Sequence, residues 1–167
     1  AAAHRGVPVF GVCGGFQMLG KKVADPFGCE CGGEEAGLGL LPLETVFGRE
    51  KYLRETQGVI GGLSGVFSCL NGQNYTGYEI HMGQSGEHAA IVNSGCVYGT
   101  YVHGIFDKEE VAERIVEALA KNKGIAMEQI HGVDYQTFKE TQYDILADAL
   151  REHLDMKKIY QILEEGA

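Results

Sequence analysis

Cys13 is the residue whose type and surroundings could do chemistry most directly. It lies in the run GVCGG, residues 11–15, which is the cysteine form of the G-x-S-x-G nucleophile elbow. In such an elbow a strained strand-to-helix turn exposes the side chain, and glycines flank it because neighbouring chain comes too close for a Cβ atom. The N-terminus of the following helix would favour a thiolate, and the N–H group of Gly14 could bind an oxyanion. The pattern therefore predicts a cysteine nucleophile.

The same segment admits two other interpretations. An unpaired cysteine is often a small core residue, which suits Cys69 and Cys96 but leaves the glycines around Cys13 unexplained. From Gly15 the run GFQMLGKK also fits G-x-x-x-x-G-K, but Lys22 stands where a phosphate-binding loop carries Ser or Thr. The nucleophile is favoured over both.

A thiol nucleophile needs a base, and six histidines are available. His103 ends the strand-like run VYGTYVH and so would lie at a strand terminus, where sheet-based sites usually occur. His81, in GYEIHMG, is the second candidate, and Glu79 shares its face of a strand because alternate residues point the same way. That pair could equally be a structural hydrogen bond. The other histidines lie in polar or terminal segments that suit surface positions: His4, His88, His131 and His153.

The elements that must position these residues follow from changes of composition along the chain. Residues 7–12 are apolar and β-prone, which is typical of a buried strand in a parallel sheet, and an apolar, helix-like pattern follows Cys13. Between residues 28 and 104 glycine recurs among short β-prone pieces, which predicts strands and turns. Asp107 with Glu110 predicts a helix N-cap and its capping-box partner. Apolar residues follow at a spacing of four: Val111, Ile115 and Leu119.

A second helical block is expected from about Phe138 onward, with a break near Asp155. A strand, a sharp turn and a helix at the start, with helices at the end, predict an α/β fold with one open, mostly parallel sheet flanked by helices. The apolar stripe of the second block contains Ile145, Leu146, Ala149, Leu150 and Leu154.

Length, charge and cysteine usage restrict the setting. The 167 residues, 44% of them hydrophobic, suffice for one compact domain. A net charge of −9 without any Lys/Arg-rich run disfavours nucleic acid as a partner. No apolar run approaches ~20 residues and no signal-peptide layout is present, which disfavours a membrane. The five cysteines show no disulfide or zinc spacing, and Cys29 and Cys31 are expected in a loop. Reduced thiols, no metal and a cytoplasmic location are therefore expected.

These residues resemble a known family. The segment GVPVFGVCGGFQMLG is similar to the nucleophile segment of class I glutamine amidotransferases. DPFG, GLGLLPLETVF, GYEIHMG, GTYVHGIF and YDILADALREHLDMKKIY resemble the cobyric acid synthase branch over almost the entire chain. The resemblance implies that residues 1–167 form a flavodoxin-like glutaminase domain, incomplete at its N-terminus, with no cofactor of its own. It also implies an upstream synthetase domain, outside this chain, that binds ATP, magnesium and a corrinoid.

The resemblance assigns roles to individual residues. Cys13 would attack the glutamine carboxamide, and His103 would act as acid and base. Gly14 would supply an oxyanion N–H, and Gln17, one helical turn after the cysteine, would help to position glutamine. In this family the ammonia amidates the b, d, e and g carboxylates of adenosylcobyrinic acid a,c-diamide during cobalamin biosynthesis. Two further residues would shape the site or face the partner domain: Glu79 and His81.

Two departures from the family pattern bear on the site. Many class I amidotransferases carry His-x-Glu, but Ile105 stands two residues after His103, so Glu79, Asp107 or a backbone carbonyl must orient the imidazole. The chain also starts a few residues before the elbow strand and lacks the preceding glycine loop that completes the oxyanion hole, and losing one oxyanion donor typically costs about 10²–10³ in rate. This chain by itself is therefore expected to be a fragment with poor glutaminase activity.

Three other functions stay open at this point. One is another amidotransferase, such as cobyrinic acid a,c-diamide synthase or a cell-wall-precursor amidase partner. The others are a stand-alone cysteine hydrolase of related fold, which the incomplete oxyanion site disfavours, and a binding or regulatory module with an inert cysteine. A substrate assay separates the amidotransferases, and labelling of Cys13 by a glutamine-derived electrophile separates enzyme from binding module.

Overall fold

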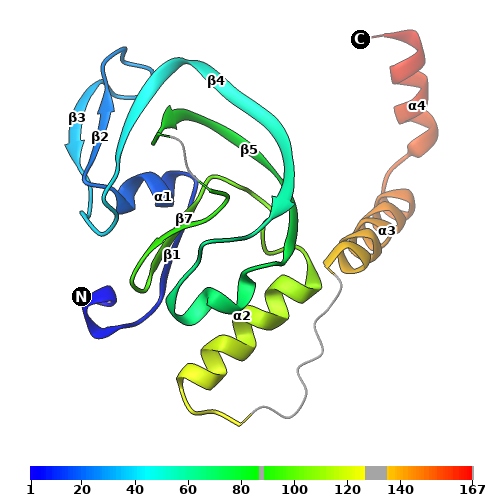
Figure 1. Cartoon of the computed structure of the whole chain (residues 1–167). Coiled ribbons are helices and arrows are strands. Elements are labelled where there is room, and N and C mark those ends of the chain that lie inside the picture. The colour runs from blue at the N-terminus through cyan, green and yellow to red at the C-terminus, as the bar shows by residue number, and fades with distance from the viewer. Residues whose placement is uncertain (87–88, 127–134, 167) are drawn as a thin grey trace. The chain divides into compact units, whose positions relative to one another are not determined.

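The computed structural model describes residues 1–86, 89–126 and 135–166. The chain divides into two units, Ala1–Gly132 and Val133–Ala167. The first contains two sheets, and Figure 1 shows its elements. In chain order these are the 3₁₀ turn η1 (Ala3–Arg5), β1 (Val9–Val12), α1 (Gly14–Leu19), β2 (Lys22–Asp25), β3 (Gly33–Ala36), β4 (Glu44–Val59), the 3₁₀ turn η2 (Gly65–Leu70), β5 (Asn74–Gln84), β6 (Val92–Ser94), β7 (Val97–Thr100) and α2 (Glu109–Asn122).

The smaller sheet has the strand order β1-β7-β6. β1 and β7 pair in parallel, from Val9 opposite Val97 to Val12 opposite Thr100. β6 and β7 form an antiparallel hairpin. Because the carboxyl ends of adjacent parallel strands meet at one edge of a sheet, the chain that follows Val12 and the chain that follows Thr100 emerge side by side.

The larger sheet has the strand order β3-β2-β4-β5. β4 and β5 form a long antiparallel hairpin, which Figure 1 shows as a curved ribbon beside α1. Its register shifts between Phe47 and Tyr52, and a bulge of this kind bends a strand. The chain after α1 is attached to this sheet by a hydrogen bond from Lys21 N to Leu43 O (2.7 Å) and by the parallel pairing of β2 with β4.

The structure confirms the α/β class predicted from the sequence, but the strands are arranged differently. There are two sheets instead of one, and two of the five strand pairings, β1–β7 and β2–β4, are parallel. A tight turn, which joins only antiparallel strands, connects β6 to β7, whereas longer connections join the antiparallel pairs β2–β3 and β4–β5. The expectation that residues 1–167 form one glutaminase domain stays a prediction.

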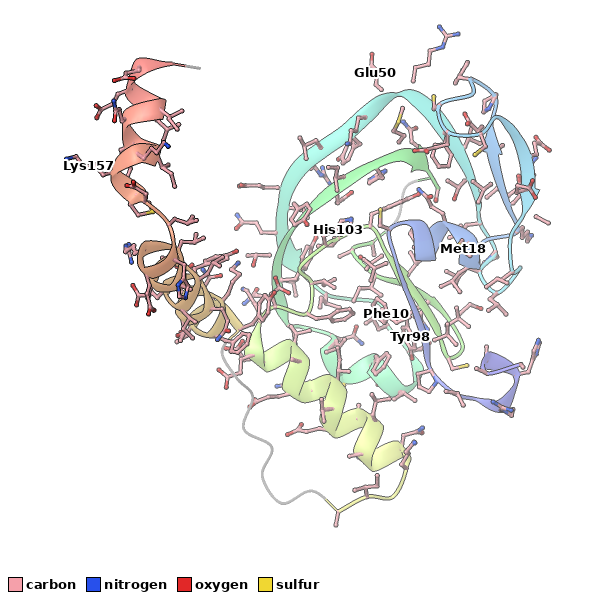
Figure 2. The ribbon with its side chains drawn as sticks, turned by 180° about the vertical axis from the view of Figure 1, so that it is seen from behind. Phe10, Met18, Glu50, Tyr98, His103 and Lys157 are labelled. Carbon is pink, nitrogen blue, oxygen red and sulfur yellow. The ribbon has the colours of Figure 1, made fainter. Side chains whose placement is uncertain are left out.

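Two apolar clusters pack against the smaller sheet. One surrounds Tyr98 and Phe10, whose rings stack with centroids 6.0 Å apart, and it extends to α2 (Figure 2). The other packs α1 against β7, where the fully buried Phe16 meets Tyr101 edge-on at 5.0 Å. Gly99 of β7 lies against the Phe16 ring, and a Cβ atom there would collide with it. One aromatic side chain therefore anchors the short helix α1 to β7.

The capping box predicted before α2 is wrong. α2 begins at Glu109, and its N-cap is Lys108, which makes no side-chain capping bond. Asp107 belongs instead to the turn after His103, where its N–H donates to Gly104 O (3.0 Å) and Gly104 has a φ of 77°. The predicted apolar face of the helix is confirmed, because these residues pack into the cluster next to α2: Val111, Ile115 and Leu119.

The second unit contains the helices predicted near the C-terminus, α3 (Tyr135–His153) and α4 (Met156–Glu165). Asp155 lies between them and caps α4 by accepting the N–H of Lys158 (3.0 Å). No described residue of either helix is buried, and the stripe predicted on α3 includes exposed apolar side chains: Ile145, Leu146 and Leu150. None of the helices in the described part of the chain is both long and apolar enough to cross a membrane.

The connection between β2 and β3 is organised by one carboxylate. Asp25 is 7% exposed and accepts the backbone N–H groups of Cys29 (2.9 Å), Glu30 (2.8 Å) and Gly32 (2.9 Å). These bonds, the one from Glu30 most of all, hold the pKa of Asp25 below its usual 3.8. Cys29 and Cys31 lie in this connection, as the sequence predicts.

The lowered pKa of Asp25 makes the stability of the protein depend on pH. Because the fold favours the ionised form, the stabilisation is complete above the ordinary pKa of 3.8 and is lost as the pH falls through the lower pKa of the folded protein. We expect Asp25→Asn to lower the melting temperature near pH 7 and the difference from wild type to shrink toward about pH 2. Calorimetry between about pH 2 and pH 7 measures the difference in melting temperature between Asp25→Asn and wild type. A difference that stays constant with pH would contradict the assignment.

Candidate active site

Cys13 lies at the junction of β1 and α1, where it is the N-cap of the helix. Its backbone has φ 52° and ψ −112°, and no other non-glycine residue in the described part of the chain has a positive φ. Such a conformation typically costs about 1–3 kcal/mol, so the surrounding structure must hold it. A hydrogen bond from Cys13 N to Thr100 O (2.8 Å) ties the turn to the end of β7. The strand, strained turn and helix of a nucleophile elbow are all present.

The glycines around Cys13 serve two different purposes. A Cβ atom on Gly11 would lie 2.7 Å from both Gly15 C and Gly15 O and 2.7 Å from Leu19 Cδ1. Gly14 and Gly15 are exposed, and a Cβ atom on either would meet nothing within 4 Å. Close packing therefore requires Gly11 but not Gly14 or Gly15, and the sequence-based expectation for these two is wrong. They leave the outer face of the elbow open.

β5 contacts both Cys13 and His103. Cys13 Sγ donates to Ile80 O at 3.6 Å. Two residues earlier on the same strand, Tyr78 exchanges backbone hydrogen bonds with His103, at 3.1 Å from Tyr78 N to His103 O and 2.8 Å from His103 N to Tyr78 O. Figure 2 shows His103 between the ribbons of β5 and α1. The predicted nucleophile and the predicted base therefore lie against the same short stretch of one strand.

The two candidate bases differ in whether a ring nitrogen is free. His103 Nε2 is buried and has no hydrogen-bond partner among the described residues. His81 has both nitrogens engaged, Nδ1 with Gly83 O at 2.7 Å and Nε2 with Glu79 Oε2 at 3.3 Å. Because a general base needs a free lone pair, the geometry favours His103. Of the other histidines, two are exposed and two lie outside the described residues: His4 and His153, and His88 and His131.

The orientation of the His103 ring does not come from a carboxylate. Ile105, at the position of the usual glutamate, is a core residue with 1% exposure. Neither Glu79, Asp107 nor any backbone carbonyl in the described part of the chain hydrogen-bonds the imidazole, so none of the orienting groups expected from the sequence is seen. The ring of Tyr78 instead lies flat against it, with centroids 5.0 Å apart and 10° between the planes.

Glu79 and His81 form a buried charged cluster on β5. Glu79 is 8% exposed and accepts a hydrogen bond from Arg54 Nη2 at 3.2 Å on one side while facing His81 Nε2 on the other. The bond to Glu79 raises the pKa of the Arg54 guanidinium. This cluster fastens β4 to β5.

Gln17 points into the structure. It is 8% exposed, its Nε2 donates to Tyr101 OH at 3.4 Å, and a Cβ atom on Gly83 would lie only 2.5 Å from that nitrogen. Tyr101 OH also bonds to Ser85 Oγ (2.6 Å), and burial raises the pKa of Tyr101, which keeps the phenol neutral. Gln17 therefore links α1 to β5 and Tyr101. Its predicted contact with glutamine stays a prediction.

Two tyrosines contact the candidate histidines, and neither is predicted from the sequence as a site residue. Tyr101 stacks on His81 with centroids 3.8 Å apart and 15° between the planes, and Tyr78 stacks on His103. Both stand in the motifs that carry the histidines, GYEIHMG and GTYVHGIF. An aromatic residue close to a candidate histidine in each motif was the signal available.

The remaining cysteines have structural surroundings. Cys69 and Cys96 are half-buried against the apolar clusters, in line with the expectation for small core residues. Cys29 Sγ donates to Gly48 O (3.3 Å), and Cys31 is exposed. Across residues 1–86, 89–126 and 135–166, no group of three or more His, Cys, Asp or Glu side chains is arranged to hold a metal ion.

Comparisons with known proteins agree with one another. Residues 1–111 match the family described as CobB/CobQ-like glutamine amidotransferase domain. The cobyric acid synthase of Lachnoclostridium phytofermentans is 47% identical over an alignment that covers 95% of this chain and 36% of that protein. The cobyric acid synthases of Ruminiclostridium cellulolyticum and Photorhabdus laumondii are 42% and 41% identical over 98% and 97% of the chain. The chain spans about a third of the length of these curated relatives.

Proposed function

The chain belongs to the CobB/CobQ-like glutamine amidotransferase domain family, and from this premise we propose that it is the glutaminase domain of a cobyric acid synthase. It hydrolyses glutamine and passes ammonia to a synthetase domain, which uses ATP to amidate the b, d, e and g carboxylates of a corrinoid in cobalamin biosynthesis. The names of the relatives support this substrate class. The chain spans about a third of their length, so the proposed synthetase domain, with its ATP and magnesium, belongs to the remainder.

The proposed reaction begins with attack by Cys13 on the carboxamide carbon of glutamine. His103 takes the thiol proton, an S–C bond forms, and the carbonyl oxygen becomes an oxyanion that the Gly14 N–H group stabilises. The C–N bond then breaks as His103 gives its proton to the leaving nitrogen. Ammonia departs, and a γ-glutamyl thioester remains on Cys13.

Hydrolysis of the thioester uses the same groups in the second half. Water attacks the carbonyl carbon, His103 accepts a proton from it, and the S–C bond breaks to release glutamate. The proton on His103 returns to the Cys13 sulfur. The covalent intermediate divides one difficult amide hydrolysis into two easier steps.

The observation that carries the proposal is the strained backbone of Cys13. A cysteine that only fills space in a core needs no positive φ, whereas a nucleophile presented at a sharp turn does. Two neighbouring features support it. The open face above Gly14 and Gly15 gives a carboxamide room to approach, and the free Nε2 of His103 can take a proton.

A glutamine-derived diazoketone is expected to alkylate Cys13 in the full-length protein. The reagent binds where glutamine binds and reacts with an activated thiolate, so it should label one cysteine and glutamine should slow the reaction. Peptide mass spectrometry measures the label on each of the five cysteines. We expect about one equivalent on Cys13, and a much slower reaction in His103→Asn, because an acid–base group typically contributes about 10²–10⁴ in rate.

Iodoacetamide is the matched control for this labelling, because it lacks the glutamine portion and reacts according to exposure. Cys31 is the internal reference, since its thiol is exposed. Preference of the diazoketone for Cys13, without the same preference by iodoacetamide, supports a glutamine site. Equal labelling of Cys13 and Cys31 by both reagents would contradict the proposal and favour a binding module with an inert cysteine.

The remaining parts of the proposal concern the corrinoid substrate and the location of the protein in the cell. An amidation assay with adenosylcobyrinic acid a,c-diamide and with cobyrinic acid separates cobyric acid synthase from cobyrinic acid a,c-diamide synthase. A cytoplasmic location belongs to the same proposal and is supported by the five free thiols.

A further inference from the structure

We propose that Tyr78 is the positioning residue of His103, in the place that an acidic residue holds in a catalytic triad. This inference rests on the proposed function, because His103 needs a fixed orientation only if it moves protons. Tyr78 acts through ring stacking and backbone hydrogen bonds instead of a carboxylate hydrogen bond.

Tyr78 holds His103 by its backbone and its ring together. The two residues form an isolated antiparallel bridge with hydrogen bonds of 3.1 and 2.8 Å, and their rings stack with centroids 5.0 Å apart and 10° between the planes. The backbone bonds determine where the histidine Cα lies, and the flat contact limits how the imidazole rotates. His103 Nε2 is held in the interior with no hydrogen-bond partner among the described residues.

Neither Glu79 nor Asp107 hydrogen-bonds the imidazole of His103 in the described part of the chain. Glu79 is bonded to Arg54 (3.2 Å) and His81 (3.3 Å). The Asp107 carboxylate lies over the glycine that follows His103, with Oδ2 3.2 Å from the position a Cβ would take on Gly104. The side chain that packs flat against the imidazole is instead Tyr78.

Gly77 makes this close approach possible. A Cβ atom on Gly77 would collide with His103 O and would lie 2.7 Å from Val102 Cγ1. β5 therefore runs directly against the backbone of residues 102–103, closer than a residue with a side chain permits. Gly77 therefore leaves space for the backbone of His103, and the next residue, Tyr78, orients its ring.

The test compares Tyr78→Phe with Tyr78→Leu in the full-length protein. Phenylalanine keeps the ring and is expected to keep the kcat and KM for glutamine hydrolysis within about twofold, whereas leucine removes the ring. We expect Tyr78→Leu to lower kcat by about tenfold to a hundredfold, which is part of the total contribution of an acid–base group. KM should stay within about threefold, because the change affects proton transfer more than substrate binding. Glutamate release measures both constants.

Tyr52→Leu is the matched control. Tyr52 is also a partly exposed tyrosine, and it lies against the other histidine, with centroids 5.0 Å from His81 and 33° between the planes. Its loss is expected to leave kcat within about twofold. Melting temperatures show whether each variant folds. If Tyr78→Leu does not fold, Tyr78→Ile, which suits a strand better and also lacks a ring, should show the same loss of kcat.

Three results would overturn the positioning role: wild-type kcat in the folded ring-less variants, a loss in Tyr78→Phe as large as in Tyr78→Leu, or an equal loss in Tyr52→Leu. Failure of the proposed function has a different signature. If Cys13→Ala still hydrolyses glutamine, the glutaminase proposal fails whatever Tyr78 does. If Cys13→Ala is inactive while folded Tyr78→Leu is fully active, only the role of Tyr78 is wrong.

Discussion

Replacing Cys13 by alanine is expected to abolish glutamine-dependent amidation by the full-length protein while free ammonia still supports it. Alanine removes the sulfur that would form the thioester, and losing a catalytic nucleophile typically costs at least about 10³-fold in rate. The proposed synthetase step would consume ammonia whatever its source, so this step should be unaffected. The measurement is the amount of amide formed from glutamine and, separately, from an ammonium salt.

Cys96→Ala is the control for this experiment. Cys96 is also a half-buried free thiol whose Sγ donates to Ala3 O (3.3 Å), and it precedes β7, whereas Cys13 is bonded to Thr100 at the other end of that strand. Both nitrogen sources should support amidation by Cys96→Ala near the wild-type rate. Cys13→Ser, which keeps a hydroxyl of similar size, should lose the use of glutamine as Cys13→Ala does. Equal loss with both nitrogen sources in the Cys13 variants would indicate a structural cysteine.

Gly11→Ala is expected to disrupt the elbow through packing alone. The added Cβ would lie 2.7 Å from the carbonyl carbon and oxygen of Gly15, which are backbone atoms and cannot rotate away, and 2.7 Å from Leu19 Cδ1. Overpacking of this kind typically costs about 1–3 kcal/mol, and a backbone contact puts the cost at the upper end. A loss of about 2 kcal/mol lowers the melting temperature by about 4–8 °C in a protein of this size. Glutamine hydrolysis should fall as well, because α1 must shift.

Gly15→Ala is the matched control for Gly11→Ala. Gly15 lies in the first turn of α1, its φ is not positive, and a Cβ there would meet nothing within 4 Å. Alanine favours a helix over glycine by up to about 1 kcal/mol, so the melting temperature should stay the same or rise slightly. Calorimetry on both variants makes the comparison. Similar destabilisation by the two substitutions would show that close packing at Gly11 is not what the elbow needs.

The local structure around Cys13 could be predicted from the sequence, because it depends on residues that are neighbours in the chain. An apolar β-prone run before Gly11 and an apolar helical pattern after Cys13 leave room only for a sharp turn at the cysteine. The same kind of pattern placed His103 at the end of a strand, but β7 ends at Thr100 and His103 lies beyond it in an isolated bridge with Tyr78. The apolar face of α2 was predictable for this reason too, since spacing of four along a helix needs no knowledge of what covers it.

Other features could not be predicted because they depend on tertiary contacts, which join residues that do not follow one another in a local pattern. Asp107 looks like an N-cap from its spacing to Glu110, but the positive φ of Gly104 draws it into the preceding turn and the helix starts later. Gln17 shares a helix face with Cys13, yet it is turned inward because Tyr101 offers its side chain a partner. In each case a competing contact decided between conformations that the sequence allowed.

The sequence by itself determined the elbow at Cys13 and a short choice of histidines, since both follow from local backbone preferences. Only the tertiary structure decided which histidine keeps a free nitrogen and which side chain lies against it. Cys13 meets Ile80 across 67 positions of the chain, and the strand that carries Ile80 also holds His103 through Tyr78. Contacts between such distant segments depend on how the whole domain packs. The periodicity of a short stretch of sequence therefore cannot predict them.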